Sequence, residues 1–209
     1  MKGLLLKDFY MTKKYCKSYL LIAAIFIVLS LVNEDNLFFV FYPCLLCGMI
    51  PVTLLGYDER SRWMQYSGTL PYTKGQIVSC KYLIGLMAQM AMLLVTGIAQ
   101  AVKMNIDGTF QLNDYMVLML IMLILAMLTS SISLPFIFKL GVEKGRAAYY
   151  VMVGVVCAGS IVAANFFKAA SQMEIQRNGM MPLLGFGGIG IYALSWYLSI
   201  IFYKKREIN

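Results

Sequence analysis

Long apolar runs separated by short polar gaps are the feature that most constrains the fold of this chain. A helix crosses a hydrocarbon core of about 30 Å with roughly 20 apolar residues. Apolar residues make up 60% of the 209 residues and charged residues only 13%, which excludes an ordinary water-soluble fold. We therefore expect one all-α integral membrane domain, residues 1–209, with six spans. The predicted spans are Ser18–Val32, Leu37–Gly56, Tyr82–Val102, Tyr115–Phe138, Ala147–Phe167 and Met181–Tyr203.

The Lys and Arg residues alternate between the two sides of these spans. Fifteen of the 18 fall in the N-terminal segment, the gaps after spans two and four, and the C-terminal tail. Only Lys103, Lys168 and Arg177 fall on the other side. Because cytoplasmic loops are enriched in Lys and Arg, this pattern places both termini in the cytoplasm. The net charge of +8 thus has a role in topology and at anionic lipid headgroups, and no motif indicates nucleic-acid binding.

Residues 1–17 are too polar to form a span and are predicted to form an interfacial helix. Their five lysines gather on one side when the segment is drawn as a helix, and Leu4, Leu5 and Phe9 lie on the other side. Leu6 and Tyr10 interrupt this pattern. The alternative is that the segment serves only as an orientation signal, and the two interpretations are compatible.

A second short helix is predicted over residues 57–71, between spans two and three. Asp58 and Glu59 are expected in its first turn, where negative charge is favourable. Trp63, Tyr66 and Leu70 follow at helical spacing and form one apolar stripe. Gly68 and Pro71 are expected to end this helix, and Thr73 to Gln76 has the spacing of a capping box that opens span three. Such a helix would lie flat on the cytoplasmic face and leave basic side chains for a cytosolic partner.

Residues 1–10 (MKGLLLKDFY) and residues 58–83 carry a resemblance to a known family. They resemble the permease subunits of type-2 ABC exporters, particularly the compact bacterial group that includes phenol-soluble-modulin-type peptide exporters. The six spans and cytoplasmic termini extend the resemblance over the whole chain. It implies that the segment after span two is a coupling helix that docks on a separate ATPase. The positions that would couple to the ATPase are Asp58, Glu59, Arg60, Arg62, Trp63, Tyr66, Leu70 and Pro71.

The same resemblance implies the partners and the location of the chain. Two copies of a cytosolic ABC ATPase would drive a dimer of permeases, the second permease being another copy of this chain or a paralogue. The ATPase would bind ATP and Mg²⁺, because the chain has no GxxxxGK[ST] loop of its own. We expect the chain itself to bind no cofactor or metal. The assembly would reside in the bacterial cytoplasmic membrane and export amphipathic peptides, with lipids or drugs as other possible cargo.

Two motifs that usually carry chemistry lie inside apolar spans. Gly185–Gly190 matches GxGxxG but lacks the preceding strand of a dinucleotide site, so close helix packing is the better interpretation. Cys44 and Cys47 form a CxxC pair in an apolar setting that does not favour redox or zinc chemistry. The chain has no histidine, which removes the commonest general base. We therefore predict a transport subunit and not an enzyme.

Polar residues within the spans are candidates for the wall of a substrate pathway. Serine and threonine often bond to their own helix, so a structural role is the alternative for each of them. No charged residue falls near the middle of a span, which argues against proton or sodium coupling in an ATP-independent carrier or channel. That carrier or channel is the remaining alternative to an ATP-driven exporter. The pathway candidates are Gln89, Thr96, Ser130, Ser131 and Asn165.

Overall fold

The computed structural model describes residues 2–32, 37–108, 110–147, 149–151, 153–155 and 177–205. All regular structure within these residues is α-helical, as the sequence predicts. Residues 142–147 are also helical. The helices are α1 (Lys2–Tyr15), α2 (Lys17–Val32), α3 (Leu37–Cys47), α4 (Met49–Arg60), α5 (Trp63–Ser67), α6 (Lys74–Ile106), α7 (Leu112–Leu140) and α9 (Arg177–Lys205).

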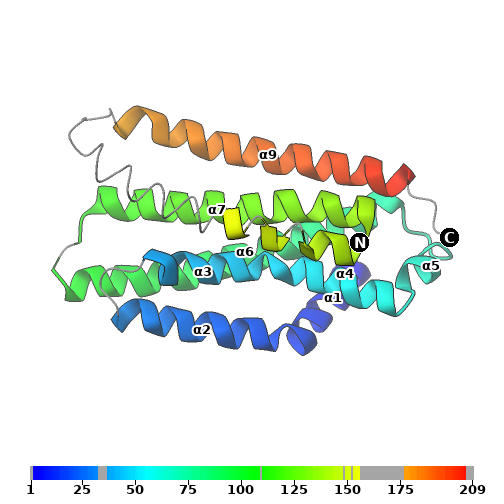
Figure 1. Ribbon diagram of the computed structural model, residues 1–209, viewed down its shortest axis with the longest axis horizontal. Helices are drawn as coiled ribbons and strands as arrows, with labels where there is room; N and C mark the ends of the chain where they lie inside the picture. Colours follow the sequence, from blue (N-terminus) through cyan, green and yellow to red (C-terminus); the bar gives the residue numbers. More distant parts are fainter. Residues whose placement is uncertain are drawn as a thin grey trace.

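The long helices run side by side as a bundle (Figure 1). Helix α2 and helix α9 lie at opposite edges of this view, with α3, α6 and α7 between them. Helix α9 packs along α7, and α2 packs along α3. This arrangement buries aliphatic and aromatic side chains in the centre and leaves other large apolar side chains of α2, α6 and α9 exposed, which suits a lipid surrounding.

Three helical segments of the described residues are long and apolar enough to cross a membrane. They are Phe38–Arg60, Lys74–Ile106 and Leu112–Leu140, which correspond to predicted spans two, three and four. A fourth is present if α1 and α2 together form one bent span. Predicted span six corresponds to α9, whereas predicted span five begins in the described residues and continues outside them. The arrangement of six spans therefore remains a prediction.

The first two helices meet at an angle of 62°, with the break at Cys16. This break lies within two residues of the predicted boundary between the interfacial segment and span one. Helix α1 turns Leu4 and Asp8 into the protein, since these side chains are buried and lie four residues apart, and Cys16 at the break is also buried. Phe9, on the predicted apolar face, is 54% exposed, and the role of this face at a membrane remains a prediction.

Glycines allow close contacts where α3, α4 and α6 cross their neighbours. A methyl group on Gly48 would lie 2.6 Å from Oγ1 of Thr129 in α7. A methyl group on Gly85 in α6 would lie 3.2 Å from the ring of Pro51 in α4. Within the GxGxxG stretch of α9, which is helical, Gly188 faces Ile124 of α7. These glycines let helix axes approach more closely than larger residues would permit.

A buried polar cluster joins α6 to α9. The hydroxyl of Tyr82 lies 2.8 Å from the Ser195 hydroxyl and 2.7 Å from the Ser199 hydroxyl. The Tyr192 hydroxyl donates to the backbone carbonyl of Tyr82 at 2.9 Å, and Trp196 stacks on the Tyr82 ring. These bonds satisfy polar groups inside an apolar bundle and fix the register of α9 against α6.

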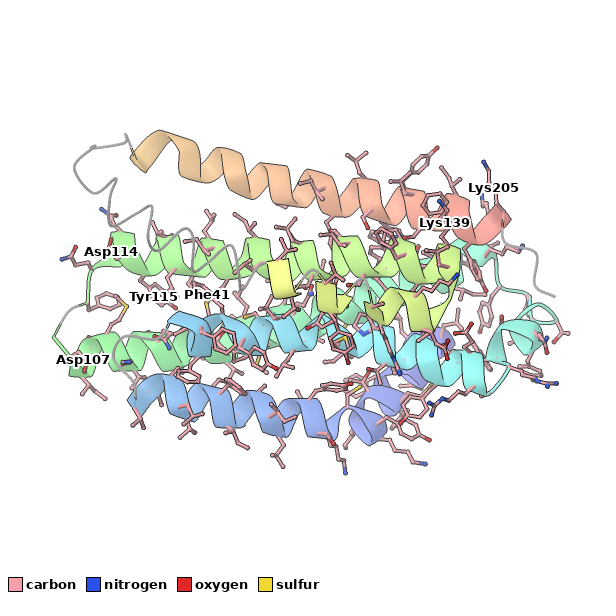
Figure 2. All side chains as sticks on the ribbon, in the orientation of Figure 1. Phe41, Asp107, Asp114, Tyr115, Lys139 and Lys205 are labelled. Atoms are coloured by element: carbon pink, nitrogen blue, oxygen red, sulfur yellow. The ribbon has the colours of Figure 1, made fainter. Side chains whose placement is uncertain are left out.

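The labelled lysines and the labelled aspartates lie at opposite ends of the bundle (Figure 2). Lys139 and Lys205 lie at one end, and Asp107 and Asp114 lie at the other. Helix α5 and the beginning of α6 lie at the end that carries Lys139 and Lys205. We call this end the basic end. It is the end that the positive-inside pattern assigns to the cytoplasm.

Candidate functional site

The segment between α4 and α6 turns at the basic end of the bundle and contains the candidate coupling residues (Figure 1). It does not form one helix over 57–71. Helix α4 continues from the span to Arg60, Ser61 caps it, and Arg62 takes a left-handed backbone conformation with a φ of 52°. The short helix α5 then covers Trp63–Ser67. A positive φ at a residue other than glycine interrupts the helix there.

Asp58 and Glu59 therefore do not open a separate helix, and that prediction is wrong. Both lie in the last turn of α4. A helix C-terminus disfavours negative charge, so other partners must compensate Asp58, which is only 2% exposed. Glu59 is exposed, and its carboxylate accepts a hydrogen bond from the backbone N–H of Val142 at 3.2 Å. The two acids thus have different roles despite being neighbours.

Four charged side chains meet at the basic end and form what we call the four-charge cluster. Its members are Lys7 and Asp8 of α1, Asp58 of α4 and Lys81 of α6. The ammonium group of Lys81 lies 2.8 Å from the Asp8 carboxylate and 2.5 Å from the Asp58 carboxylate. Lys7 donates to the other oxygen of Asp58 at 2.7 Å. Two cations and two carboxylates balance, so the cluster carries no formal net charge.

Burial makes the four-charge cluster energetically demanding. The side chains of Lys81, Asp8 and Asp58 are 2%, 2% and 3% exposed, whereas Lys7 is 24% exposed. The thiol of Cys80 also donates to Asp8, at 3.5 Å. Taking a charge out of water costs several kcal/mol, so each of these ions depends on its neighbours. Separating α1, α4 and α6 would leave buried charges without partners.

Helix α5 is attached to the four-charge cluster through an aromatic contact. The ammonium group of Lys7 lies 3.9 Å from the centre of the Trp63 ring, a cation–π distance. Trp63 is half-buried and packs against the main hydrophobic core of the bundle. Trp63 of α5 thus contacts Lys7 of α1, which in turn pairs with Asp58 of α4.

The remaining candidate coupling side chains lie at or near the surface. Arg60, Arg62 and Tyr66 are exposed, the last of them by 58%. Gln65 is exposed as well, so α5 presents a short mixed surface away from the bundle. Leu70 is half-buried and Pro71 is exposed in the turns that lead to α6.

The predicted capping box at the beginning of α6 is confirmed. The Thr73 hydroxyl accepts from the backbone N–H of Gln76 at 3.3 Å, and the Gln76 side chain accepts from the backbone N–H of Thr73 at 3.2 Å. These reciprocal bonds fix the first turn of α6, and Lys81 lies in the following turns. The cap therefore helps to set the position of a charge in the four-charge cluster.

The pathway candidates in the described residues are mostly engaged in bonds within the subunit. Gln89 is buried and donates to the Ala126 carbonyl at 2.6 Å and to the Ser130 hydroxyl at 2.8 Å. Thr96 bonds to carbonyl groups of its own helix. Ser131 is buried, and its hydroxyl has no hydrogen-bond partner among the described residues. Asn165 lies outside the described residues. The pathway role of these residues remains a prediction.

No metal centre is formed within the described ranges. They contain no group of three or more Cys, Asp or Glu side chains placed to hold a metal ion. Cys44 and Cys47 are free and fully enclosed in the packing of α3, with Cys44 close to Thr96.

Three members of the four-charge cluster were missed by the sequence analysis. Lys7 and Lys81 were treated only as topology signals, and Asp8 was not considered. One local signal existed: Asp8 is the only acid among the first 17 residues, and it lies one helical turn after Leu4. A single acid on an otherwise apolar helix face indicates a buried partner, but the sequence does not say that the partner is Lys81.

Comparison with known proteins gives one match. Residues 3–204 match the family model described as ABC-2 family transporter protein. No curated protein and no solved structure matches the chain.

Proposed function

The chain belongs to the ABC-2 family of transporter proteins, and we propose that it is the permease subunit of an ATP-driven exporter. The family makes it a multi-pass membrane transport subunit that works with an ABC ATPase. Our proposal adds that two copies of a cytosolic ATPase move a dimer of permeases in a bacterial cytoplasmic membrane. ATP and Mg²⁺ are bound by the ATPase in this scheme.

The observation that carries the proposal is the four-charge cluster with its link to α5. In our scheme the ATPase binds α5 and the neighbouring exposed residues, including Arg62 and Tyr66. ATP closes the two ATPase subunits and displaces α5. Because Trp63 contacts Lys7, and Lys7 belongs to a cluster shared by α1, α4 and α6, these helices move together.

The energetic requirement is that the nucleotide state of the ATPase favours one conformation of the permease. A ligand shifts such an equilibrium only by its difference in affinity for the two states. We propose that an inward-facing and an outward-facing dimer are the two states. Breaking the four-charge cluster would be costly, so the conformational change is expected to occur between groups of helices and not within α1, α4 and α6.

Amphipathic peptides are the proposed cargo. Large apolar side chains are exposed on one side of α6, including Met87, Leu94, Val95 and Ile98. In a dimer such a surface contacts either lipid or an apolar cargo. Ion coupling is not needed when ATP supplies the energy, which agrees with the scarcity of charges within the spans.

The test uses the complex of the tagged permease with its co-purifying ATPase in liposomes. The α5 variants Arg62→Gln and Tyr66→Ala change exposed side chains and should leave the bundle folded. We expect at least a tenfold loss in ATP-dependent uptake of an amphipathic peptide into inside-out vesicles. We also expect weaker association with the ATPase. Lys139→Gln, an exposed change at the same end on α7, is the matched control and should keep both properties.

Two results would overturn the proposal. One is wild-type transport and ATPase association in both α5 variants. The other is full transport by liposomes that hold the chain without any ATPase, which would favour an ATP-independent carrier or channel.

A further inference from the structure

Two adjoining cavities lie at the basic end, and residues at the bend between α1 and α2 line the smaller one. The smaller has a volume of about 290 Å³ and the larger about 390 Å³. Gly56, Arg60 and Arg146 line both of them. Each is far larger than the roughly 30 Å³ that a water molecule occupies in the liquid, so each has room for a multi-atom polar group.

The smaller cavity is lined by positive charge and hydroxyl groups. Among the described residues, Arg60 and Arg146 are the charged residues of its lining, and none of the described carboxylates lines it. Neither guanidinium takes part in an ion pair within the described part of the chain. The hydroxyl-bearing residues of the lining are Tyr15, Ser18, Tyr19, Thr53 and Tyr57.

The shape of the smaller cavity is set by packing contacts on its walls. The Tyr15 and Tyr57 rings stack with their centres 4.1 Å apart, which joins the end of α1 to α4. The Thr53 hydroxyl donates to the Tyr19 hydroxyl at 3.2 Å, which joins α4 to α2. Gly56 lies under Arg146, because a methyl group there would be 2.9 Å from a guanidinium nitrogen. The cavity is therefore a built feature of three packed segments.

The larger cavity has a different balance of charge. Its lining adds Lys144 to the two arginines but also contains Glu59 and Glu143. Glu59 already accepts a bond from Val142, as described above. The carboxylates make this cavity less suited to an anion than the smaller one.

We propose that the smaller cavity binds the phosphate group of an anionic phospholipid headgroup. Arginine presents paired N–H donors that match phosphate oxygens, and two arginines without a competing carboxylate favour an anion strongly. Tyrosines concentrate where membrane meets water, and three of them line this cavity. The cavity lies at the bend of α1 and α2, where a helix along the surface meets a helix that enters the bundle.

A lipid suits this position better than an acidic segment of the ATPase. No residue of α5 lines either cavity, and Arg60 is the one candidate coupling residue in the described lining of the smaller cavity. The inference requires the membrane location given by the family but does not depend on the coupling role of α5. Its failure can thus be distinguished from failure of the proposed function.

The experiment measures lipid binding to the purified chain in detergent, without the ATPase. Native mass spectrometry is used with short-chain phosphatidylglycerol, with phosphatidylcholine of the same chain length, and with glycerol phosphate, which has no acyl chain. We expect phosphatidylglycerol to bind at least tenfold more tightly than either comparison compound. The double variant R60Q/R146Q should lose this preference, whereas R60K/R146K should retain part of it because charge remains but the paired donors do not.

The control variant is Lys13→Gln, which removes an exposed cation of α1 that lines neither cavity. It should change phosphatidylglycerol affinity by less than twofold. Circular dichroism and gel filtration establish that each variant is folded, and Tyr57→Phe provides a milder second variant with an expected affinity loss of two- to fivefold.

Four outcomes would overturn the proposal. Equal binding of phosphatidylglycerol and phosphatidylcholine would show that the cavity does not select a lipid with a net negative charge. Unchanged phosphatidylglycerol binding by folded R60Q/R146Q would place the ligand elsewhere. Tight binding of glycerol phosphate would show that a soluble phosphate compound, and not a lipid, is the ligand. Loss of ATPase association in R60Q/R146Q with unchanged lipid binding would assign the arginines to the protein partner.

Discussion

Lys81 is the more deeply buried of the two cations in the four-charge cluster. It contacts two buried carboxylates that belong to different helices. We predict that Lys81→Met lowers the free energy of unfolding by about 3–5 kcal/mol, because Asp8 and Asp58 are then left with only Lys7. The free energy of unfolding is measured by titrating the purified chain from dodecylmaltoside into SDS while following helix content.

A second variant tests whether the loss of stability in Lys81→Met comes from unbalanced charge or only from the loss of the lysine side chain. Lys81→Met with Asp8→Leu leaves a neutral pair of Lys7 and Asp58, so we expect it to be more stable than Lys81→Met alone. Lys13→Met, which removes an exposed lysine, is the control and should change stability by less than about 0.5 kcal/mol. If the double variant is the less stable of the two, charge balance does not explain the cluster.

Gly48 is a second residue whose environment has a measurable consequence. A methyl group there would collide with both Oγ1 and Cβ of Thr129, at 2.6 and 2.9 Å. We predict that Gly48→Ala destabilises the chain by about 1–3 kcal/mol, the usual effect of overpacking. Gly190→Ala in α9 is the matched control, because nothing lies within 4 Å of its added methyl group. The same SDS titration measures both, and equal stability of the two variants would contradict the close contact.

The glycines also show what a sequence pattern can indicate. Gly185–Gly190 suggested close helix packing because it repeats small residues, but Gly187 and Gly190 have open space beside them in this subunit. A methyl group on the isolated Gly48, in contrast, would lie 2.6 Å from Oγ1 of Thr129 in α7. The pattern indicates which residues are small, whereas the neighbouring helix decides which of them is in contact.

At the scale of helices, Gln89 connects α6 to α7. Its amide donates to three groups of α7, at Ala126, Thr129 and Ser130. We predict that Gln89→Leu destabilises the bundle by about 0.6–1.7 kcal/mol, the range measured for bonds between membrane helices. If stability is unchanged in the SDS titration while peptide transport falls, Gln89 serves the substrate pathway and not the helix pair. Gln65→Leu, an exposed glutamine change in α5, is the stability control and should be neutral.

The helix ends differ in how well the sequence predicts them. The capping box of α6 was predicted because all of its bonds lie within four residues. The end of α4 was not, because Asp58 is tolerated in the last helical turn only through Lys7 and Lys81, which are distant in the sequence. Local signals therefore gave the beginning of a helix correctly, and a tertiary contact overrode the local preference at the end of another.

For the whole molecule, the separation of charge between the two ends predicts an orientation in the membrane. A variant with native cysteines replaced by serine would carry one new cysteine, either Tyr66→Cys in α5 or Asn105→Cys near the end of α6. Both side chains are exposed, and α5 lies at the opposite end of the bundle from Asp107, which follows α6. With a membrane-impermeant thiol reagent on intact cells, we expect at least fivefold more labelling at position 105 than at position 66. The reverse ratio would contradict cytoplasmic placement of α5.

The overall class and the central spans of the molecule follow from the sequence, because apolar length and charge alternation are averaged over many residues. Predicted spans two to four agree with Phe38–Arg60, Lys74–Ile106 and Leu112–Leu140. The four-charge cluster and the arginine-lined cavity could not be predicted in this way. They depend on individual side chains, such as Asp8, Arg60 and Arg146, that meet only after the helices have packed.

The position of Lys81 also has a consequence for how the chain is made. Asp8 leaves the ribosome 73 residues before Lys81, the residue that neutralises it in the bundle. Until Lys81 has been synthesised, Lys7 is the one cation of the four-charge cluster that is available to Asp8. The N-terminal helix is synthesised first, and its buried ion pair with α6 can form only after the beginning of α6 has been made.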